Sequence, residues 1–120
     1  GALRQAGADQ ASAEAAAASV TAHKVQRDVE IAADRDVIDA QQGLEAWRQA
    51  HLAEGTSNAM LARMQKAYDL GDQGLTELLI ARRQHYDMRR TEAHARGAAH
   101  SAVLQLLIDS HRIWGLSDEE

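Results

Sequence analysis

The 120-residue chain contains no proline, no cysteine and no phenylalanine, and aromatic residues make up only 3% of it. Without proline, no residue along the chain forces a helix to kink or to end. Because the apolar fraction consists mostly of alanine, the chain also lacks the bulky side chains that fill a thick globular core. The absence of cysteine excludes disulfides but does not decide between an oxidising and a reducing compartment. These absences favour an elongated or oligomeric protein.

Charge and hydropathy exclude two further classes. The net charge is -5 with both signs interspersed, so the chain has no basic patch of the kind that binds nucleic acid. No apolar run of about 18 residues is present, so no transmembrane helix is predicted. The sequence also has no signal peptide or lipidation motif. The first residue is glycine rather than methionine, which leads us to expect a piece of a longer protein.

Two long stretches of the sequence have helical periodicity. Apolar residues at spacings of three, four and seven predict one helix over about 8–70 and a second over about 75–114. The first would be about 95 Å long at ~1.5 Å per residue. In it, Ala22, Ala33 and Leu44 recur every eleven residues, which favours little supercoil or a right-handed one. In the second, a seven-residue apolar line is expected to face the first helix in a coiled coil. That line consists of Leu79, Tyr86, Ala93, His100, Leu107 and Trp114.

The segment 71–74 separates these two patterns. Gly71 and Gly74 are the only glycines close enough together to reverse the chain there, and Thr76 or Asp72 can cap the helix that follows. The sequence therefore predicts an all-α fold: one domain over residues 1–120, built as a long antiparallel helical hairpin. A break at Gly55-Thr56-Ser57-Asn58 would instead give three helices. Each of these residues costs at most ~1 kcal/mol inside a helix, so we expect an unbroken helix.

Catalysis and metal binding are not predicted. The chain has no cysteine nucleophile, no Gly-x-Ser-x-Gly elbow and no phosphate-binding glycine loop, so we expect no enzyme and no cofactor. Six histidines and many carboxylates invite a metal site, but no Glu-x-x-His or His-x-x-x-His spacing occurs. The arginines of the second helix are interpreted as a solvated or salt-bridged flank. Near the tip, Tyr68 covers the end of the hairpin or has a specific role. Glu77 either stabilises a helix N-terminus or contributes to a carboxylate ring, if several hairpins surround a pore.

Two segments carry a resemblance to a known family. Tyr68-x-x-Gly71, followed by Leu75-x-Glu77-Leu78-Leu79-x-Ala81-Arg82-Arg83, resembles the tip of the outer-membrane efflux channels of the TolC type. The end of the second helix, from Leu106 to Trp114, is similar to the same region in the Czc-like heavy-metal cation-efflux branch. The resemblance extends over residues 8–114, although only the tip and this end are specific.

This resemblance implies a fold, an assembly and a location. In the family, a homotrimer of helical hairpins forms a periplasmic tunnel, a TolC-like α-barrel. A periplasmic adaptor protein joins it to an inner-membrane pump of the RND type. The hairpin is thus expected to lie in the periplasmic portion of an outer-membrane channel of a Gram-negative cell envelope. The β-barrel of such a channel is expected outside these 120 residues. Heavy-metal cations are the cargo implied by the branch.

The resemblance also implies roles for six residues. Leu70, Gly71 and Asp72 match the turn that contacts the adaptor, Tyr68 matches a tyrosine that holds the tip closed, and Glu77 matches an acid that lines the aperture. Gln73 stands where some members carry a closing arginine, so no charged latch is expected there. Ile80 replaces a second aperture acid, which makes any carboxylate ring thinner.

Two other interpretations of the same residues stay open. The first is a structural coiled-coil hairpin that oligomerises into a helical bundle. The second is a bundle that binds metal through histidines and carboxylates. An exposed Tyr-x-x-Gly turn favours the channel over a plain scaffold, because a scaffold has no need of one.

Overall fold

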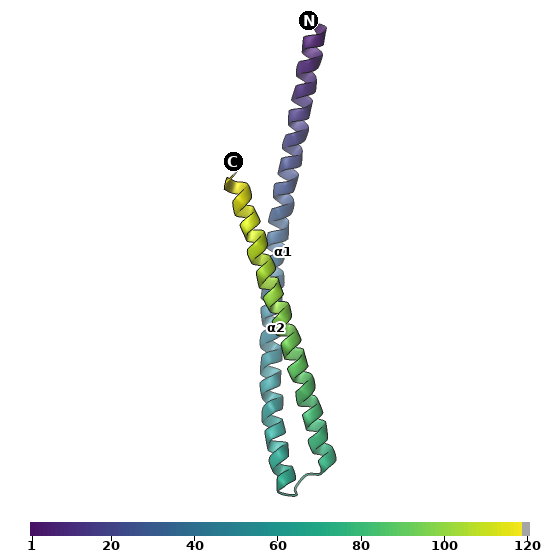
Figure 1. Cartoon of the computed structure of the whole chain (residues 1–120), viewed down its shortest axis with the longest axis vertical. Helices are drawn as coiled ribbons and strands as arrows, with labels where there is room; N and C mark the ends of the chain where they lie inside the picture. The colour runs from purple at the N-terminus through teal and green to yellow at the C-terminus, as the bar shows by residue number, and fades with distance from the viewer. Residues whose placement is uncertain (119–120) are drawn as a thin grey trace.

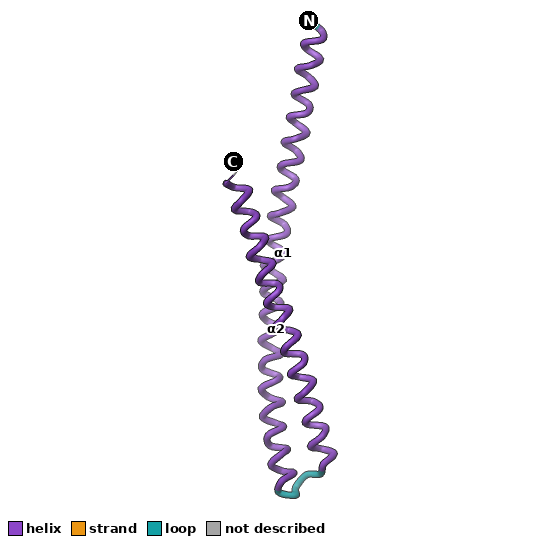
Figure 2. Tube along the Cα trace, viewed as in Figure 1, coloured by secondary structure: helices purple, strands orange, loops and turns teal. Residues whose placement is uncertain are grey.

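The computed structural model describes residues 1–118, which form an antiparallel hairpin of two helices, α1 (Ala2–Asp69) and α2 (Leu75–Asp118). A short loop joins them at one end, drawn in teal in Figure 2. The hairpin measures 103 × 23 × 13 Å, so the predicted all-α hairpin and its length are confirmed. Both helices are longer than predicted. Helix α1 begins at Ala2, and α2 continues through Gly115, where we expected it to end. Gly115 does not take the positive φ that ends many helices. The segment 116–120, which the sequence leads us to expect as a frayed acidic tail, is helical through Asp118, and residues 119 and 120 lie outside the described residues.

Helix α1 continues without a break through residues 55–58, and the predicted unbroken helix is confirmed. The Ser57 hydroxyl donates a hydrogen bond to the carbonyl oxygen of Glu54 at 2.9 Å, and it also lies 3.0 Å from Nδ1 of His85 on α2. This serine therefore contributes to the contact between the helices instead of capping a new one. The three-helix alternative is wrong for this chain.

The two helices pack through a narrow seam of mostly small and polar side chains. The least exposed side chains along both helices are spaced alternately by three and four residues, the heptad pattern of a coiled coil. On α1 they are Val29, Ala33, Asp36, Ala40, Gly43, Trp47, Ala50, Glu54, Ser57, Leu61 and Met64. On α2 they are Leu78, Ala81, His85, Met88, Glu92, Ala95, Ala99, Ala102, Leu106, Asp109 and Ile113. The seam follows a seven-residue repeat, and the eleven-residue repeat does not define it, since Ala22 and Leu44 are exposed.

The apolar line predicted to face α1 lies on the outside of α2. Tyr86, Leu107 and Trp114 are 58%, 61% and 69% exposed, and the seam residues of α2 precede this line by one position. The reason is the small size of the seam residues, which lets the two helices approach closely. A Cβ atom added at Gly43 would lie 3.2 Å from the Cα atom of Ala99. The larger apolar side chains are therefore left for a different contact.

Helix α1 extends well beyond the end of α2 (Figure 1). Helix α1 has 68 residues and α2 has 44, so about 24 residues, or ~36 Å at 1.5 Å per residue, have no partner in this chain. Every residue from Gly1 to Val25 is exposed. In proteins, most of the stability of a helix comes from packing of one face rather than from helix propensity, and the overhang lacks such packing within this chain.

Candidate functional site at the hairpin tip

The chain leaves α1 through a glycine-dependent C-terminal cap. Gly71 has a φ of +80°, a backbone conformation that residues other than glycine rarely adopt. The N–H of Gly71 donates to the carbonyl oxygen of Tyr68 at 3.0 Å, and the N–H of Asp72 donates to that of Ala67 at 2.8 Å. This pair of hydrogen bonds is the Schellman motif, which satisfies carbonyl groups left without partners at a helix end. The predicted turn at Gly71 is confirmed, and its cause is this backbone conformation.

Helix α2 begins at Leu75, so Gly74 takes the N-cap position. Thr76, predicted as a possible cap, lies inside the first turn, and Asp72 remains in the loop. The N–H of Leu78 donates to the carbonyl oxygen of Gly74 at 3.3 Å. Glu77 is the acidic residue of this first turn, where a negative charge interacts favourably with the helix dipole.

The tip presents a short exposed surface. Leu70 is 68% exposed, and Gly71, Asp72, Gln73 and Glu77 are exposed as well. Tyr68, in the last turn of α1, is 38% exposed. Gln73 also lines a shallow groove on the tip, together with Met60, Arg63, Met64 and Ala67. The six predicted site residues thus come from one loop and the two helix turns beside it, and all are accessible to another molecule.

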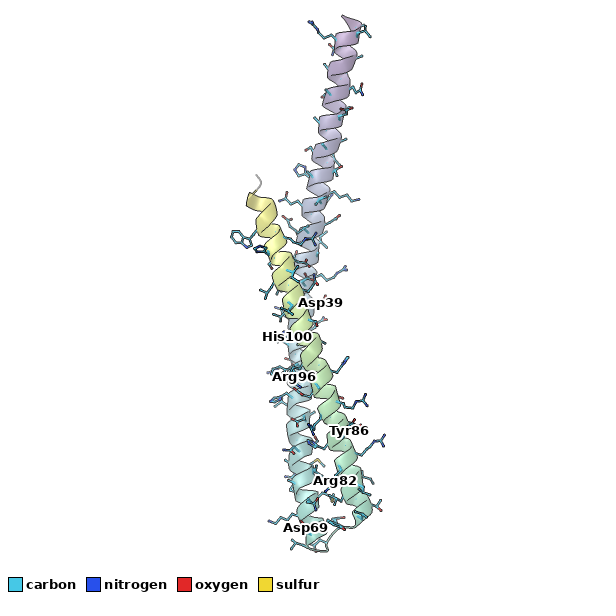
Figure 3. The ribbon with its side chains drawn as sticks, in the orientation of Figure 1. Asp39, Asp69, Arg82, Tyr86, Arg96 and His100 are labelled. Atoms are coloured by element: carbon cyan, nitrogen blue, oxygen red, sulfur yellow. The ribbon has the colours of Figure 1, made fainter. Side chains whose placement is uncertain are left out.

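Above the tip, one face of the hairpin is lined by arginines. Arg82 donates to Oε1 of Gln65 across the two helices at 2.9 Å, and Arg96 pairs with Glu92 at 3.3 Å on its own helix. Tyr86 lies between these two arginines along α2, and Figure 3 labels all three side chains. The groove beside Tyr86 is lined by Asn58, Leu61, Ala62, Gln65, Arg82, His85 and Arg89. The arginines that we interpreted as a salt-bridged flank therefore include one that joins the helices.

Sequence reasoning missed the polar contacts inside the seam. The indole N–H of Trp47 donates to Oε1 of Glu92 at 3.1 Å, and the Trp47 ring stacks on the His51 ring at 5.4 Å between centroids. The heptad spacing of Trp47 from Ala40 and Ala33 places this tryptophan on the apolar stripe of the first helix, whereas nothing in the sequence marks Glu92 as its hydrogen-bond partner.

A pair of carboxyl groups in the seam was also missed. Asp36 and Asp109 are hydrogen-bonded to each other between the helices, and both are buried. The hydrogen bond with Asp109 raises the pKa of Asp36, and the same bond lowers the pKa of Asp109. Each aspartate occupies a heptad position, and that pattern could have indicated burial.

Neither a metal site nor a membrane-spanning helix is found in the described part of the chain. Within residues 1–118, no three histidine or acidic side chains are grouped so that they could hold a metal ion. Over the same residues, neither helix has an apolar stretch long enough to cross a bilayer.

No protein-family model, curated protein or solved structure matches the chain. The features of the hairpin that bear on function are the glycine tip and the outward apolar line of α2.

Proposed function

We propose that this hairpin forms part of the periplasmic tunnel wall of a TolC-type outer-membrane efflux channel in a tripartite export system of the RND type. The hairpin itself catalyses nothing and binds no cofactor. It lines a conduit through which an inner-membrane pump exports its cargo, which the Czc-like resemblance assigns to heavy-metal cations. The channel is a homotrimer, and its periplasmic end meets an adaptor protein.

The observation that carries this proposal is the exposed apolar residue at the tip of the hairpin. A hairpin 103 Å long ends in a single tight loop whose apolar Leu70 is 68% exposed beside Gly71 at positive φ. Burying that leucine side chain would be favourable, by about 1.5–3 kcal/mol if it became fully buried. A loop that only joined two helices would gain nothing from such exposure. Leu70, Gly71 and Asp72 therefore serve as the adaptor contact.

The exposed surface supports lateral assembly. A compact monomer of 13.1 kDa would expose about 6,400 Å² by the usual scaling of area with mass, whereas this hairpin exposes 9,329 Å². The apolar line of α2 and the overhang of α1 are both exposed. In a tunnel wall, the helices of neighbouring hairpins cover such faces, as in other helical bundles.

Two further roles follow for residues at the tip. Tyr68 and Gln73 flank the turn and take part in closing the tunnel, with Gln73 contributing hydrogen bonds where a charged latch is absent. Glu77 is exposed in the first turn of α2 and lines the aperture, where a ring of carboxylates favours cations.

Site-specific cross-linking in the intact channel tests the adaptor contact. Because these 120 residues contain no cysteine, Asp72→Cys places a single thiol at the tip within this segment. The matched control is Gln10→Cys, about 90 Å from the tip at 1.5 Å per residue. We expect a cross-link to the adaptor from residue 72 and none from residue 10. Adding Gly71→Trp to the first variant should abolish the cross-link while helicity is retained. Equal cross-linking with and without the tryptophan would contradict the proposal.

Single-channel recording tests the aperture role of Glu77. Glu77→Gln should weaken block by divalent cations, since each subunit loses one carboxylate from the ring. The control is Glu14→Gln, which removes an exposed carboxylate from the other end of α1. If Glu77→Gln and the parent channel conduct and block identically, Glu77 has no pore role.

A second candidate function is a structural hairpin that associates into a four-helix bundle. The outward apolar line favours it as well, because pairing two copies would cover the same faces. The two candidates differ at the tip, since the bundle gives no role to an exposed Leu70.

A further inference from the structure

Asp36 and Asp109 meet inside the seam, toward the end of the hairpin opposite the tip. Asp36 lies on α1 between Ala33 and Ala40, and Asp109 lies in the last third of α2. Only 8% of Asp36 and 6% of Asp109 is exposed. Two buried carboxyl groups that interact across the seam repel each other when both are ionised, so such a pair keeps one shared proton to a higher pH than an isolated carboxyl group does.

The surroundings show which aspartate carries the charge. Oδ2 of Asp109 accepts a hydrogen bond from Nε2 of Gln105 at 3.2 Å, and its Oδ1 lies 3.6 Å from Nη1 of Arg112. Asp36 has no such support, because its Oδ2 is buried without a hydrogen-bond partner. On the same helix, the negative charge of Asp39 also raises the pKa of Asp36, and the positive charge of Arg35 lowers it. Asp109 is therefore the ionised member, and Asp36 holds the proton.

We propose that Asp36 and Asp109 form a proton-dependent clasp that fastens the end of α2 to α1. With one proton, the Asp36 hydroxyl donates to the Asp109 carboxylate and the seam is closed. When that proton is lost, two negative charges face each other between the helices, and the end of α2 moves away from α1. Closer to the tip, the Trp47–Glu92 hydrogen bond and the Gly43–Ala99 contact hold the helices together, so the opening is confined to the end beyond them. This clasp does not depend on the proposed channel function.

The direction of the pH effect follows from the two pKa shifts. The pKa of Asp36 is raised above its ordinary value of 3.8, so its contribution to stability is complete below pH 3.8 and is lost as the pH rises through the raised pKa. The pKa of Asp109 is lowered, so its contribution is present above pH 3.8 and is lost as the pH falls through the lowered pKa. The pair contributes most near pH 3.8, and its contribution falls toward neutral pH.

Thermal unfolding of three proteins tests the clasp: the parent, Asp36→Asn and Asp28→Asn. The amide introduced by Asp36→Asn donates to the Asp109 carboxylate at every pH and so replaces the proton permanently. We expect Asp36→Asn to melt above the parent at about pH 8 and close to it at about pH 4, because only the parent loses the shared proton over that range. The control residue Asp28 is exposed on the same helix and is not among the charges that shift the pKa of Asp36, so the melting temperature of Asp28→Asn should decline with pH as that of the parent does. If Asp36→Asn declines with pH as steeply as the parent, the clasp does not exist.

A distance measurement separates opening from a change in stability alone. The chain has no cysteine, so spin labels can be placed at Glu30 and His111 near the clasp, and at Met60 and Gln84 near the tip as a control. The first distance should increase between about pH 4 and about pH 8 in the parent but not in Asp36→Asn, and the second should stay constant. A constant first distance in the parent would overturn the opening. A melting temperature restored at about pH 8 by magnesium or calcium would make the pair a metal site and would also overturn the proposal.

Discussion

Gly43 of α1 lies directly against Ala99 of α2, so close that a Cβ atom at Gly43 would be 3.2 Å from the Cα atom of its neighbour. Ala99 is 4% exposed, which makes this one of the tightest parts of the seam. Close approach at this point is possible because Gly43 has no side chain and that of Ala99 is a single methyl group. The contact between the helices thus depends on the absence of a side chain at Gly43 as much as on the side chains of the other seam residues.

Replacing Gly43 tests this close approach. Glycine in the middle of a helix costs about 0.5–1 kcal/mol relative to alanine, so an unobstructed Gly→Ala substitution should stabilise the hairpin by that amount. Gly55 provides the matched case, since nothing lies within 4 Å of a Cβ atom added there. We expect Gly55→Ala to gain stability in urea unfolding followed by circular dichroism. Gly43→Ala should gain less or lose stability, because the Ala99 backbone has to move. An equal gain at both positions would show that the seam is looser than described.

Replacing Gly71 tests the tip. Its φ of +80° is a conformation that costs an L-residue roughly 1–2 kcal/mol. Gly71→Ala should therefore lower the free energy of unfolding by about that amount. Asp72→Ala is the control, because it leaves the backbone N–H of residue 72 free to donate to Ala67. If the two variants are equally stable, the left-handed conformation at Gly71 contributes nothing to the hairpin.

Sequence alone was sufficient for the course of the chain, because strong local signals determine it. Gly71 is followed within three residues by Gly74 and interrupts two helical patterns without proline, so the reversal could be placed to the residue. The same patterns correctly favoured a continuous helix through Gly55. The ends of the helices were less well predicted, since Gly115 is equally compatible with a helix end and with a helix interior.

The packing face could not be predicted from periodicity in the same way. The line through Tyr86 and Leu107 is the more apolar one on α2, yet the hairpin buries the neighbouring line that contains His85 and Ala99. An apolar stripe indicates that a face can be buried but not which molecule buries it. Asp109 was missed for a related reason, since an isolated aspartate is usually exposed.

The hydrogen bond from Trp47 to Glu92 predicts an asymmetry between the two tryptophans. Glu92 has a side chain only 15% exposed, and Trp47→Phe would remove the donor that helps to stabilise its charge. We expect a loss of about 1.5–3 kcal/mol in urea unfolding, the range for hydrogen bonds to charged groups. Trp114 is 69% exposed, so Trp114→Phe should change stability by less than about 0.5 kcal/mol. Similar losses from both substitutions would mean that the Glu92 contact adds little.

The outward apolar line predicts association of the hairpin in solution. Tyr86 and Leu107 belong to the same seven-residue line of α2, and both are more than half exposed. The double variant Tyr86→Glu with Leu107→Glu places charges on this line while leaving the seam untouched. Glutamate is a good helix former, so helicity should persist. We expect the parent to associate in light scattering and the variant to have the 13.1 kDa mass of one chain.

A control variant distinguishes association through this face from non-specific association of exposed apolar side chains. Leu3→Glu changes the most exposed large apolar side chain of the described residues, which lies on the overhang of α1 far from Tyr86. It should leave the mass of the parent unchanged if association uses the line on α2. If Leu3→Glu dissociates the parent and the double variant does not, the overhang is the contact surface. In that case the outward line would lose its role in both the channel and the bundle, and the function of the hairpin would rest on its tip.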